Sequence, residues 1–207
     1  MPESYITKYT AITTAGLYVN GEQVYAAVGK RGVEFLTAAY TTLGISYPKF
    51  YKMDSPCKAA FIAAELLFQN TAIQERYKSE DIAIVLSTAH GSLDTDLRYM
   101  ASVAQSPSPS LFVYTLANVM LGEICIRHGI KGENTCFVKD EFDAAFQTNY
   151  VNSLLQTGKA EVCLSGWADY IDGEVQVFFM LVEKNLTSLN LHNPLIVQNI
   201  YTHPWKN

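Results

Sequence analysis

The feature that most constrains the fold is a continuous apolar run, IAIVL, at residues 82–86. A run this short fits a strand better than a helix. A strand that faces solvent on one side alternates apolar and polar residues, whereas a parallel strand covered on both faces is apolar throughout. The run therefore predicts a central parallel strand with helices packed on both faces of its sheet.

Two short turn signals predict antiparallel hairpins elsewhere in the chain. Asn20-Gly21 lies between LYV and EQVY, and both positions of a two-residue hairpin turn need positive φ, which Asn and Gly tolerate. Asp172-Gly173 separates two apolar segments, EVCLSG and VQVFFMLVEK. We expect each pair of segments to form adjacent antiparallel strands.

Capping residues and apolar spacing predict the helices. Ser55 is a favourable N-cap and Pro56 suits the first helical position, ahead of the alanine-rich stretch CKAAFIAAELLF. A weaker helical pattern covers residues 32–42. A long helix is expected over residues 111–128, because Gly129 follows basic residues at its end.

Strands that alternate with helices predict an α/β sandwich. We expect layered helices on a mainly parallel, five-stranded mixed sheet that closes with an antiparallel pair. The chain has 207 residues and no internal repeat, so residues 1–207 are expected to form a single domain.

Composition excludes several classes of function. The net charge is −5 and there is no long basic run, which argues against nucleic acid as a partner. No apolar stretch reaches the roughly 18 residues of a membrane span, and the N-terminus lacks the pattern of a secretory signal. The four cysteines form no Cys-x-x-Cys pair and lie in apolar surroundings. We expect buried thiols in a reducing cytoplasm.

Three longer stretches together resemble the β-ketoacyl synthases. PKFYKMDSPCKAAFIAAE is similar to the segment in which an Arg/Lys-Met-Asp step precedes an alanine-rich helix. PSPSLFVYTLANVMLGEICIRHGIKGEN is similar to the family's long helix and its Gly-x-Asn turn, and GKAEVCLSGWADY to its Gly-x-Ala-Asp segment. The resemblance covers about residues 48–183 and implies the N-terminal half of a thiolase-like ketosynthase. Residues 184–207 remain an unassigned tail.

The resemblance also shows which catalytic residues of the family are missing. It places the acyl-accepting cysteine of the family at Glu141, and the nearest cysteine, Cys136, comes five residues earlier. The two catalytic histidines of the family belong to a second half that has no counterpart here. His192 and His203 lie in the unmatched tail, where we expect surface residues.

The turn KDEFDAAF, residues 139–146, has three interpretations that the residues leave open. In the first, Asp140 is the N-cap of the next helix, and Glu141 and Asp143 complement the helix dipole. In the second, Glu141 marks a degenerate active site. This would resemble the chain-length-factor subunits of polyketide systems, which have lost the cysteine and serve a catalytic partner. In the third, Glu141 is an acid or base whose pKa is raised by burial.

The sequence identifies no catalytic residue, metal site or cofactor. Candidates for a pocket or an interface, in chain order, are His90, Phe112, Asp140, Glu141 and Phe142. His90 follows the IAIVL strand, where it is either a satisfied loop histidine or part of a pocket rim.

The main hypothesis is a non-catalytic subunit or scaffold in biosynthesis of the fatty-acid or polyketide type, of aryl polyene or flexirubin-like class. Its implied partners are a full-length ketosynthase, an acyl-carrier protein or both, in a homodimer or a heterodimer. The alternative is an active acyltransferase, similar to a 3-oxoacyl-carrier-protein synthase, that uses a residue other than cysteine or the site of a partner.

Half of a two-half sandwich leaves an apolar face to be covered. A partner, a second copy of the chain or residues 185–207 could cover it. The segment TCFVK, residues 135–139, is the candidate edge strand for pairing between chains.

Overall fold

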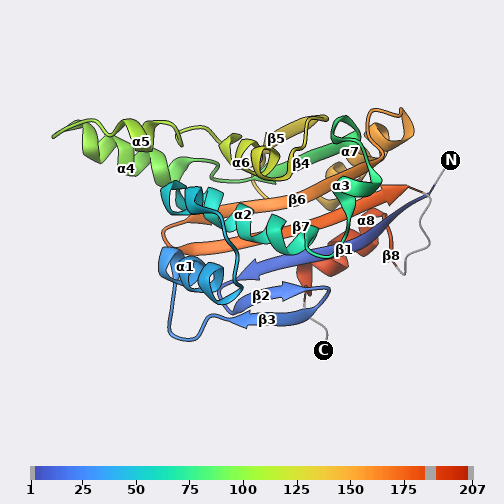
Figure 1. The fold of residues 1–207 in the computed structure, drawn as a ribbon, viewed down its shortest axis with the longest axis horizontal. Coiled ribbons are helices and arrows are strands. Elements are labelled where there is room, and N and C mark those ends of the chain that lie inside the picture. The colour runs from blue at the N-terminus through green and yellow to red at the C-terminus, as the bar shows by residue number, and fades with distance from the viewer. Residues whose placement is uncertain (1–2, 185–189, 205–207) are drawn as a thin grey trace.

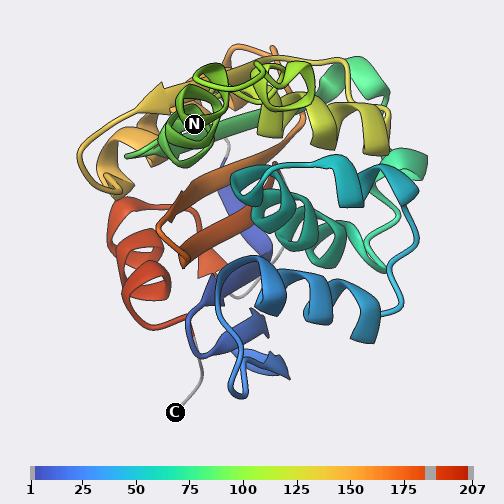
Figure 2. The same cartoon turned by 90° about the vertical axis from the view of Figure 1, so that its left-hand side faces the viewer.

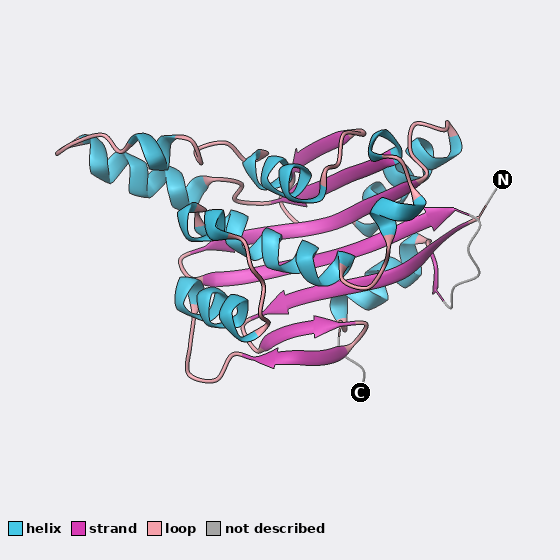
Figure 3. Cartoon of the chain, in the orientation of Figure 1, coloured by secondary structure: helices cyan, strands magenta, loops and turns pink. Residues whose placement is uncertain are grey.

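The computed structural model describes residues 3–184 and 190–204, which form one sheet with helices on both faces (Figures 1 and 3). The strands are β1 (Ser4–Thr13), β2 (Gly16–Val19), β3 (Glu22–Ala26), β4 (Ile82–Thr88), β5 (Asn134–Val138), β6 (Val162–Ile171), β7 (Glu174–Lys184) and β8 (Asn190–Leu191). The helices are α1 (Gly32–Thr42), α2 (Ser55–Phe68), α3 (Ile73–Arg76), α4 (Leu93–Val103), α5 (Pro109–Phe112), α6 (Val119–His128), α7 (Ala144–Gln156) and α8 (Pro194–Thr202), with 3-10 turns η1 (Pro48–Lys52) and η2 (Ser79–Asp81).

The sheet confirms the α/β class but differs from the expected sheet in size and in strand direction. Its order is β3-β2-β1-β7-β6-β4-β5, with β8 paired to β1, which makes eight strands in the described residues rather than five. Only β4–β5 and β4–β6 are parallel, and the other pairs are antiparallel. The difference arises because β1 pairs with β7 across the length of the chain, and this joins the two hairpins into one antiparallel half.

The central strand and both hairpins are as predicted. Every residue of β4 is buried, and β4 has a parallel neighbour on each side. Asn20 and Gly21 have φ of 50° and 85° in the turn between β2 and β3. Asp172 and Gly173 have φ of 49° and 81° between β6 and β7.

Helices α1 and α2 cover the predicted residues, with a different cap on α2. Asp54, not Ser55, is the N-cap, because its Oδ1 accepts the amide of Cys57 at 3.0 Å. Its other oxygen accepts the hydroxyl of Thr95 on α4 at 2.6 Å. Every residue of α2 except Glu65 is buried, so this helix forms the centre of one helical layer.

The long helix predicted over residues 111–128 is wrong, because the chain forms α5 and α6 with a turn segment between them. The buried hydroxyl of Tyr114 donates to Glu123 at 3.1 Å. In a continuous helix these residues would be ~13 Å apart along the axis, so the bond requires the chain to bend. The predicted end is confirmed, since Gly129 caps α6 with φ of 67°.

Two apolar cores lie on opposite faces of the sheet. Helices α1, α2 and α6 pack on one face, and α7 and α8 pack on the other, as Figure 2 shows from the end of the sheet. Helix α8 belongs to the tail that the resemblance left unassigned. Val197 on α8 is fully buried, and the ring of Tyr201 lies tilted against that of Phe142, with 4.4 Å between the ring centroids. The tail therefore covers part of the second face.

The two tail histidines behave differently from each other. His203 is exposed, as predicted. The surface prediction for His192 is wrong, because its side chain is buried at 3% exposure. Its Nδ1 lies 3.0 Å from the side-chain oxygen of Asn152 on α7 and 3.3 Å from Ser4 on β1. His192 thus joins the tail to both sides of the second core, which the sequence pattern did not show.

Residues 93–116, which contain α4 and α5, form a helical arm, and its two helices project beyond the sheet (Figure 1). Its exposed apolar side chains are Leu93, Leu97, Met100, Val103, Phe112, Val113 and Leu116. Thr95 is the buried residue of α4, and its bond to Asp54 ties the arm to the start of α2. In the part of the chain that the structure describes, no helix has the length and apolar character to span a membrane.

Candidate functional site

The candidate site lies where the parallel strands β4 and β5 end. The loop 89–92 leaves β4, and the turn 139–143 leaves β5. The amide of Lys139 donates to the carbonyl of Thr88 at 2.9 Å, which holds the loop and the turn next to each other. The carboxyl ends of parallel strands are where ligands bind in many open α/β sheets.

The turn after β5 is capped by Asp143 rather than by Asp140. Asp143 Oδ1 accepts the amide of Phe146 at 2.9 Å, and its other oxygen pairs with Lys139 Nζ at 2.8 Å. The Lys139 ammonium and the Phe146 amide lower the pKa of Asp143. The helix begins at Ala144, three residues later than the first interpretation requires, so Asp140 lies outside it.

The residues predicted around this turn divide into exposed acids and a buried ring. Asp140 and Glu141 are exposed, so Glu141 lacks the burial that its role as an acid or base would require. Phe142 is buried and packs edge-on against Trp167 and Phe178. The turn is therefore anchored in the second core by Phe142, while Asp140 and Glu141 face solvent. These residues border a hollow of about 570 Å³ that extends to Leu195 on α8.

His90 is held by a carboxylate that sequence analysis did not single out. Its Nδ1 lies 2.6 Å from Asp169 Oδ2 on β6. Asp169 Oδ1 accepts the Thr88 hydroxyl at 2.9 Å and the amides of Ala89 and His90 at 3.1 and 2.9 Å. The side chain of Asp169 is 13% exposed and that of His90 is 39% exposed. His90 is therefore both hydrogen-bonded and open to solvent.

Tyr201 on helix α8 also lies near the candidate site. Burial raises the pKa of Tyr201, the nearby carboxylates of Asp169 and Glu141 raise it further, and a hydrogen bond with Gln176 lowers it. Tyr201 thus lies near both carboxylates. Neither Asp169 nor Tyr201 could be identified from a local motif, although Asp169 lies in the segment GKAEVCLSGWADY that carried the resemblance.

Phe112 is the one candidate that lies apart from the others. It is on α5, 59% exposed, with its ring centroid 5.4 Å from that of Tyr99 on α4. The structure therefore brings together His90, Asp140, Glu141 and Phe142, and places Phe112 on the arm.

The thiols are poorly suited to nucleophilic chemistry. All four cysteines are free, and burial raises the pKa of each thiol, in the case of Cys136 to about 11. The thiolate is the reactive form of cysteine, and a raised pKa leaves little of it at neutral pH. The described residues also contain no cluster of three or more His, Cys, Asp or Glu side chains arranged to hold a metal.

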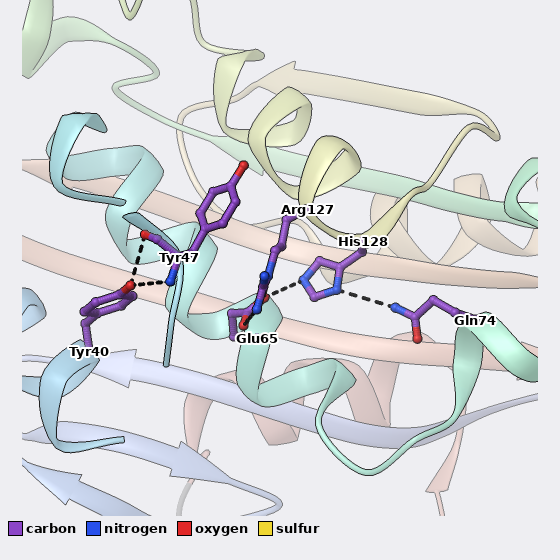
Figure 4. Close-up of polar contacts among 6 residues, drawn as sticks. All are labelled: Tyr40, Tyr47, Glu65, Gln74, Arg127 and His128. Carbon is purple, nitrogen blue, oxygen red and sulfur yellow. Dashed lines mark hydrogen bonds and ion pairs between the residues drawn. The ribbon is translucent and has the colours of Figure 1, made fainter. Parts of the chain in front are cut away.

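A second polar cluster lies on the opposite face, between α2, α3 and α6 (Figure 4). Arg127 donates to both oxygens of Glu65 at 2.8 and 2.9 Å, and His128 Nε2 lies 3.1 Å from the same carboxylate. Burial opposes ionisation of Glu65, but His128 and Arg127 outweigh it and lower its pKa to about 2. Gln74 lies 3.5 Å from the other nitrogen of His128.

The cluster borders a hollow of about 560 Å³. The charges of the cluster are paired within the protein, because the guanidinium of Arg127 donates to both oxygens of Glu65. The same guanidinium lies 5.1 Å from the ring centre of Tyr47. Tyr47 in turn exchanges hydrogen bonds with the hydroxyl of Tyr40 on α1 (Figure 4). The cluster therefore joins helices of the first layer, and we place the candidate site at the ends of β4 and β5.

Comparisons with known proteins support the fold. No protein-family model and no curated protein matches the sequence. Among solved structures, the ishigamide ketosynthase/chain length factor superposes with a TM-score of 0.70 at 17% identity over 91% of this chain and 64% of that chain. The ketosynthase-bound acyl-carrier protein complex AntDE:AntF, of a type II polyketide synthase, superposes with a TM-score of 0.62 at 11% identity over 89% of this chain and 63% of that chain.

A third structure is closer to this chain in length. The ketosynthase ApeO in complex with its chain length factor ApeC, from Xenorhabdus doucetiae, superposes with a TM-score of 0.56 at 16% identity over 98% of this chain and 91% of that chain. This chain spans less than two thirds of the ishigamide and AntDE:AntF chains. The chain therefore has the thiolase-like α/β fold of ketosynthase and chain length factor structures.

Proposed function

We propose that this chain is a ketosynthase-like subunit that does not itself condense acyl chains. It would associate with a full-length ketosynthase in biosynthesis of the fatty-acid or polyketide type, of aryl polyene or flexirubin-like class. The proposal is supported by the turn after β5, where the resemblance places the acyl-accepting cysteine of the ketosynthases and this chain has Glu141. The free thiols support a reducing cytoplasm as its location.

The proposed interface consists of the arm and the edge strand β5. Strand β5 is the last in the sheet order, so one of its sides offers unpaired backbone groups. On the arm, Leu97 is 59% exposed, Met100 65% and Leu116 62%. A concentration of exposed apolar side chains in one segment is typical of an interaction site. Complexes between a ketosynthase and a chain length factor, as in ApeO with ApeC, support a ketosynthase as the occupant.

Substitution of Leu97 by Glu is expected to weaken ketosynthase binding about 30-fold, or about 2 kcal/mol, because a carboxylate would replace an apolar side chain at the centre of the arm. The measurement is the dissociation constant for the full-length ketosynthase of the same pathway, by titration calorimetry. The matched control is Val28→Glu, since Val28 is 81% exposed and lies in the loop between β3 and α1. Equal affinities for the two variants, or a chain that forms only homodimers, would contradict the proposed interface.

The alternative is an active acyltransferase that uses Glu141. The scaffold proposal predicts that the chain transfers no acyl group from an acyl-carrier protein onto itself or onto an acceptor other than water, with or without Glu141→Gln. The measurement is mass spectrometry of the carrier protein and of this chain after incubation. Acyl transfer by the wild type that disappears in Glu141→Gln would overturn the scaffold proposal.

A further inference from the structure

We propose that His90, oriented by Asp169, is a general base that activates water against the carbonyl carbon of a short acyl thioester. This hydrolytic activity goes beyond the proposed scaffold role. Only the choice of a thioester as substrate rests on the proposed function. The general-base geometry itself rests on the contacts at the ends of β4 and β6.

Asp169 fixes which nitrogen of His90 carries the proton. A carboxylate oxygen 2.6 Å from Nδ1 accepts a hydrogen bond from it, so Nδ1 carries the hydrogen in the neutral ring and Nε2 carries the lone pair. Among the described residues Nε2 has no hydrogen-bond partner. The lone pair is therefore available to solvent on a side chain that is 39% exposed.

The carboxylate of Asp169 is itself held in place by hydrogen bonds. Its second oxygen accepts hydrogen bonds from the Thr88 hydroxyl and from the amides of Ala89 and His90. Three donors on one oxygen fix the orientation of the carboxylate and of the loop that carries His90. A base oriented by a mostly buried carboxylate is an arrangement found in general-base catalysis.

A hollow large enough for a small substrate borders Asp169, the residue that orients His90. Asp169 lines a hollow of about 310 Å³, which is formed with Thr13, Thr14, Ile171, Glu174, Val175 and Gln176. The hollow is near the lower limit of ligand-pocket sizes and has both apolar and hydrogen-bonding walls. It has room for a short acyl chain, and the residue that it shares with the proposed dyad is Asp169.

The reaction balances without any cofactor. His90 Nε2 takes a proton from water as the water oxygen bonds to the carbonyl carbon. The carbon–sulfur bond then breaks, and the imidazolium returns its proton to the leaving thiolate. The products are a carboxylic acid and a thiol, and the Asp169 carboxylate stabilises the imidazolium throughout.

The first test uses thiol release from acetyl and hexanoyl thioesters of N-acetylcysteamine, followed with a thiol-reactive dye. His90→Gln is expected to lower the rate at least about 100-fold, because a positioned base contributes about that factor or more. His203→Gln is the matched control, since His203 is an exposed histidine at the end of α8. Thermal unfolding of each variant checks that it is folded.

Asp169→Asn tests the positioning role of Asp169. The asparagine oxygen can keep the three hydrogen bonds to the loop, while its NH₂ group replaces the oxygen that faces His90. The ring should then carry its proton on Nε2, and the rate should fall as far as in His90→Gln. Nitrogen-15 NMR of the histidine rings reports this change of tautomer, which a purely structural role would not produce.

A wild-type rate equal to that of buffer, or a His90→Gln rate within twofold of wild type, would overturn the inference. Retention of both tautomer and rate in Asp169→Asn would overturn the role of Asp169. Ketosynthase affinity is measured separately with the Leu97→Glu pair, so failure of hydrolysis and failure of the scaffold proposal are distinguishable.

Discussion

Replacement of Gly166 by alanine is expected to remove most of the stability of the chain, with a loss of more than about 4 kcal/mol. Gly166 lies in the middle of β6, between Leu86 on β4 and Phe179 on β7. Its φ is 155°, and an added Cβ would lie 1.9 Å from the carbonyl oxygen of Phe178. The obstacle is backbone, so the clash can be relieved only if β7 moves away from β6.

The same position supports the candidate site. The carbonyl of Gly166 accepts a hydrogen bond from the fully buried side chain of Gln147 at 3.3 Å. Gln147 also donates to Val85 at 2.7 Å and accepts from Ser87 at 2.7 Å. These bonds fix α7 against β4 and β6, and α7 begins directly after the turn that carries Glu141.

The measurement is the free energy of unfolding in urea, extrapolated to water. The control is Gly122→Ala on α6, where an added Cβ meets no atom within 4 Å. That variant is expected to gain about 0.5–1 kcal/mol, because alanine favours the helix more than glycine does. A Gly166→Ala protein within 1 kcal/mol of wild type would show that the packing of β7 on β6 is not as tight as the structure has it.

Local patterns predicted the elements well. The apolar run of β4, the Asn20-Gly21 and Asp172-Gly173 turns and the end of α6 at Gly129 all depend on neighbours within a few residues. Each has a direct physical signal in the chain, either continuous burial or a backbone angle that few residues tolerate. These elements were therefore predicted at the right positions.

The predictions that failed depended on contacts between distant residues. The pairing of β1 with β7 changes a five-stranded, mainly parallel sheet into a larger one that is mainly antiparallel, and no local pattern encodes that pairing. The bend between α5 and α6 depends on Tyr114 and Glu123. At α7, both Asp140 and Asp143 are suitable caps by residue type, and only the length of the turn selects Asp143.

In the candidate site, too, the local features were predicted and the contacts between distant residues were not. The resemblance drew attention to the turn after β5, and its assignment of the nucleophile position to Glu141 stays a prediction. The partner of His90 could not be predicted in this way, since Asp169 is 79 residues away in the sequence and its role depends on the register between β4 and β6.

Acidification is expected to destabilise the chain first through His192. Burial lowers the pKa of this side chain from its ordinary value of 6.5 to about 4. Its Nδ1 faces the oxygen of Asn152, and its other nitrogen, which would take the second proton, is buried with no partner among the described residues. The side chains it contacts, Ser4 and Asn152, carry no charge that could compensate for the imidazolium.

Because the pKa of His192 is lower in the folded chain than in the unfolded chain, stability falls as the pH falls. Above pH 6.5 the ring is neutral in both states, and stability is complete. As the pH falls from 6.5 towards 4, only the unfolded chain takes up the proton, so stability is lost across this window. A difference of about 2.5 pKa units corresponds to about 3 kcal/mol, which is a large part of the stability of a typical domain.

The test compares the unfolding free energy at pH 7.5 and pH 4.5 for wild type and for His192→Asn, which cannot titrate. Wild type should lose about 2.5 kcal/mol more than the variant between these conditions. Glu65 does not interfere, because its pKa is lowered from 4.5 to about 2 and its contribution is lost mainly below pH 4.5. His203→Asn should behave like wild type. Equal losses in wild type and His192→Asn would mean that His192 is not buried, and therefore that the tail does not cover the second face of the sheet in solution.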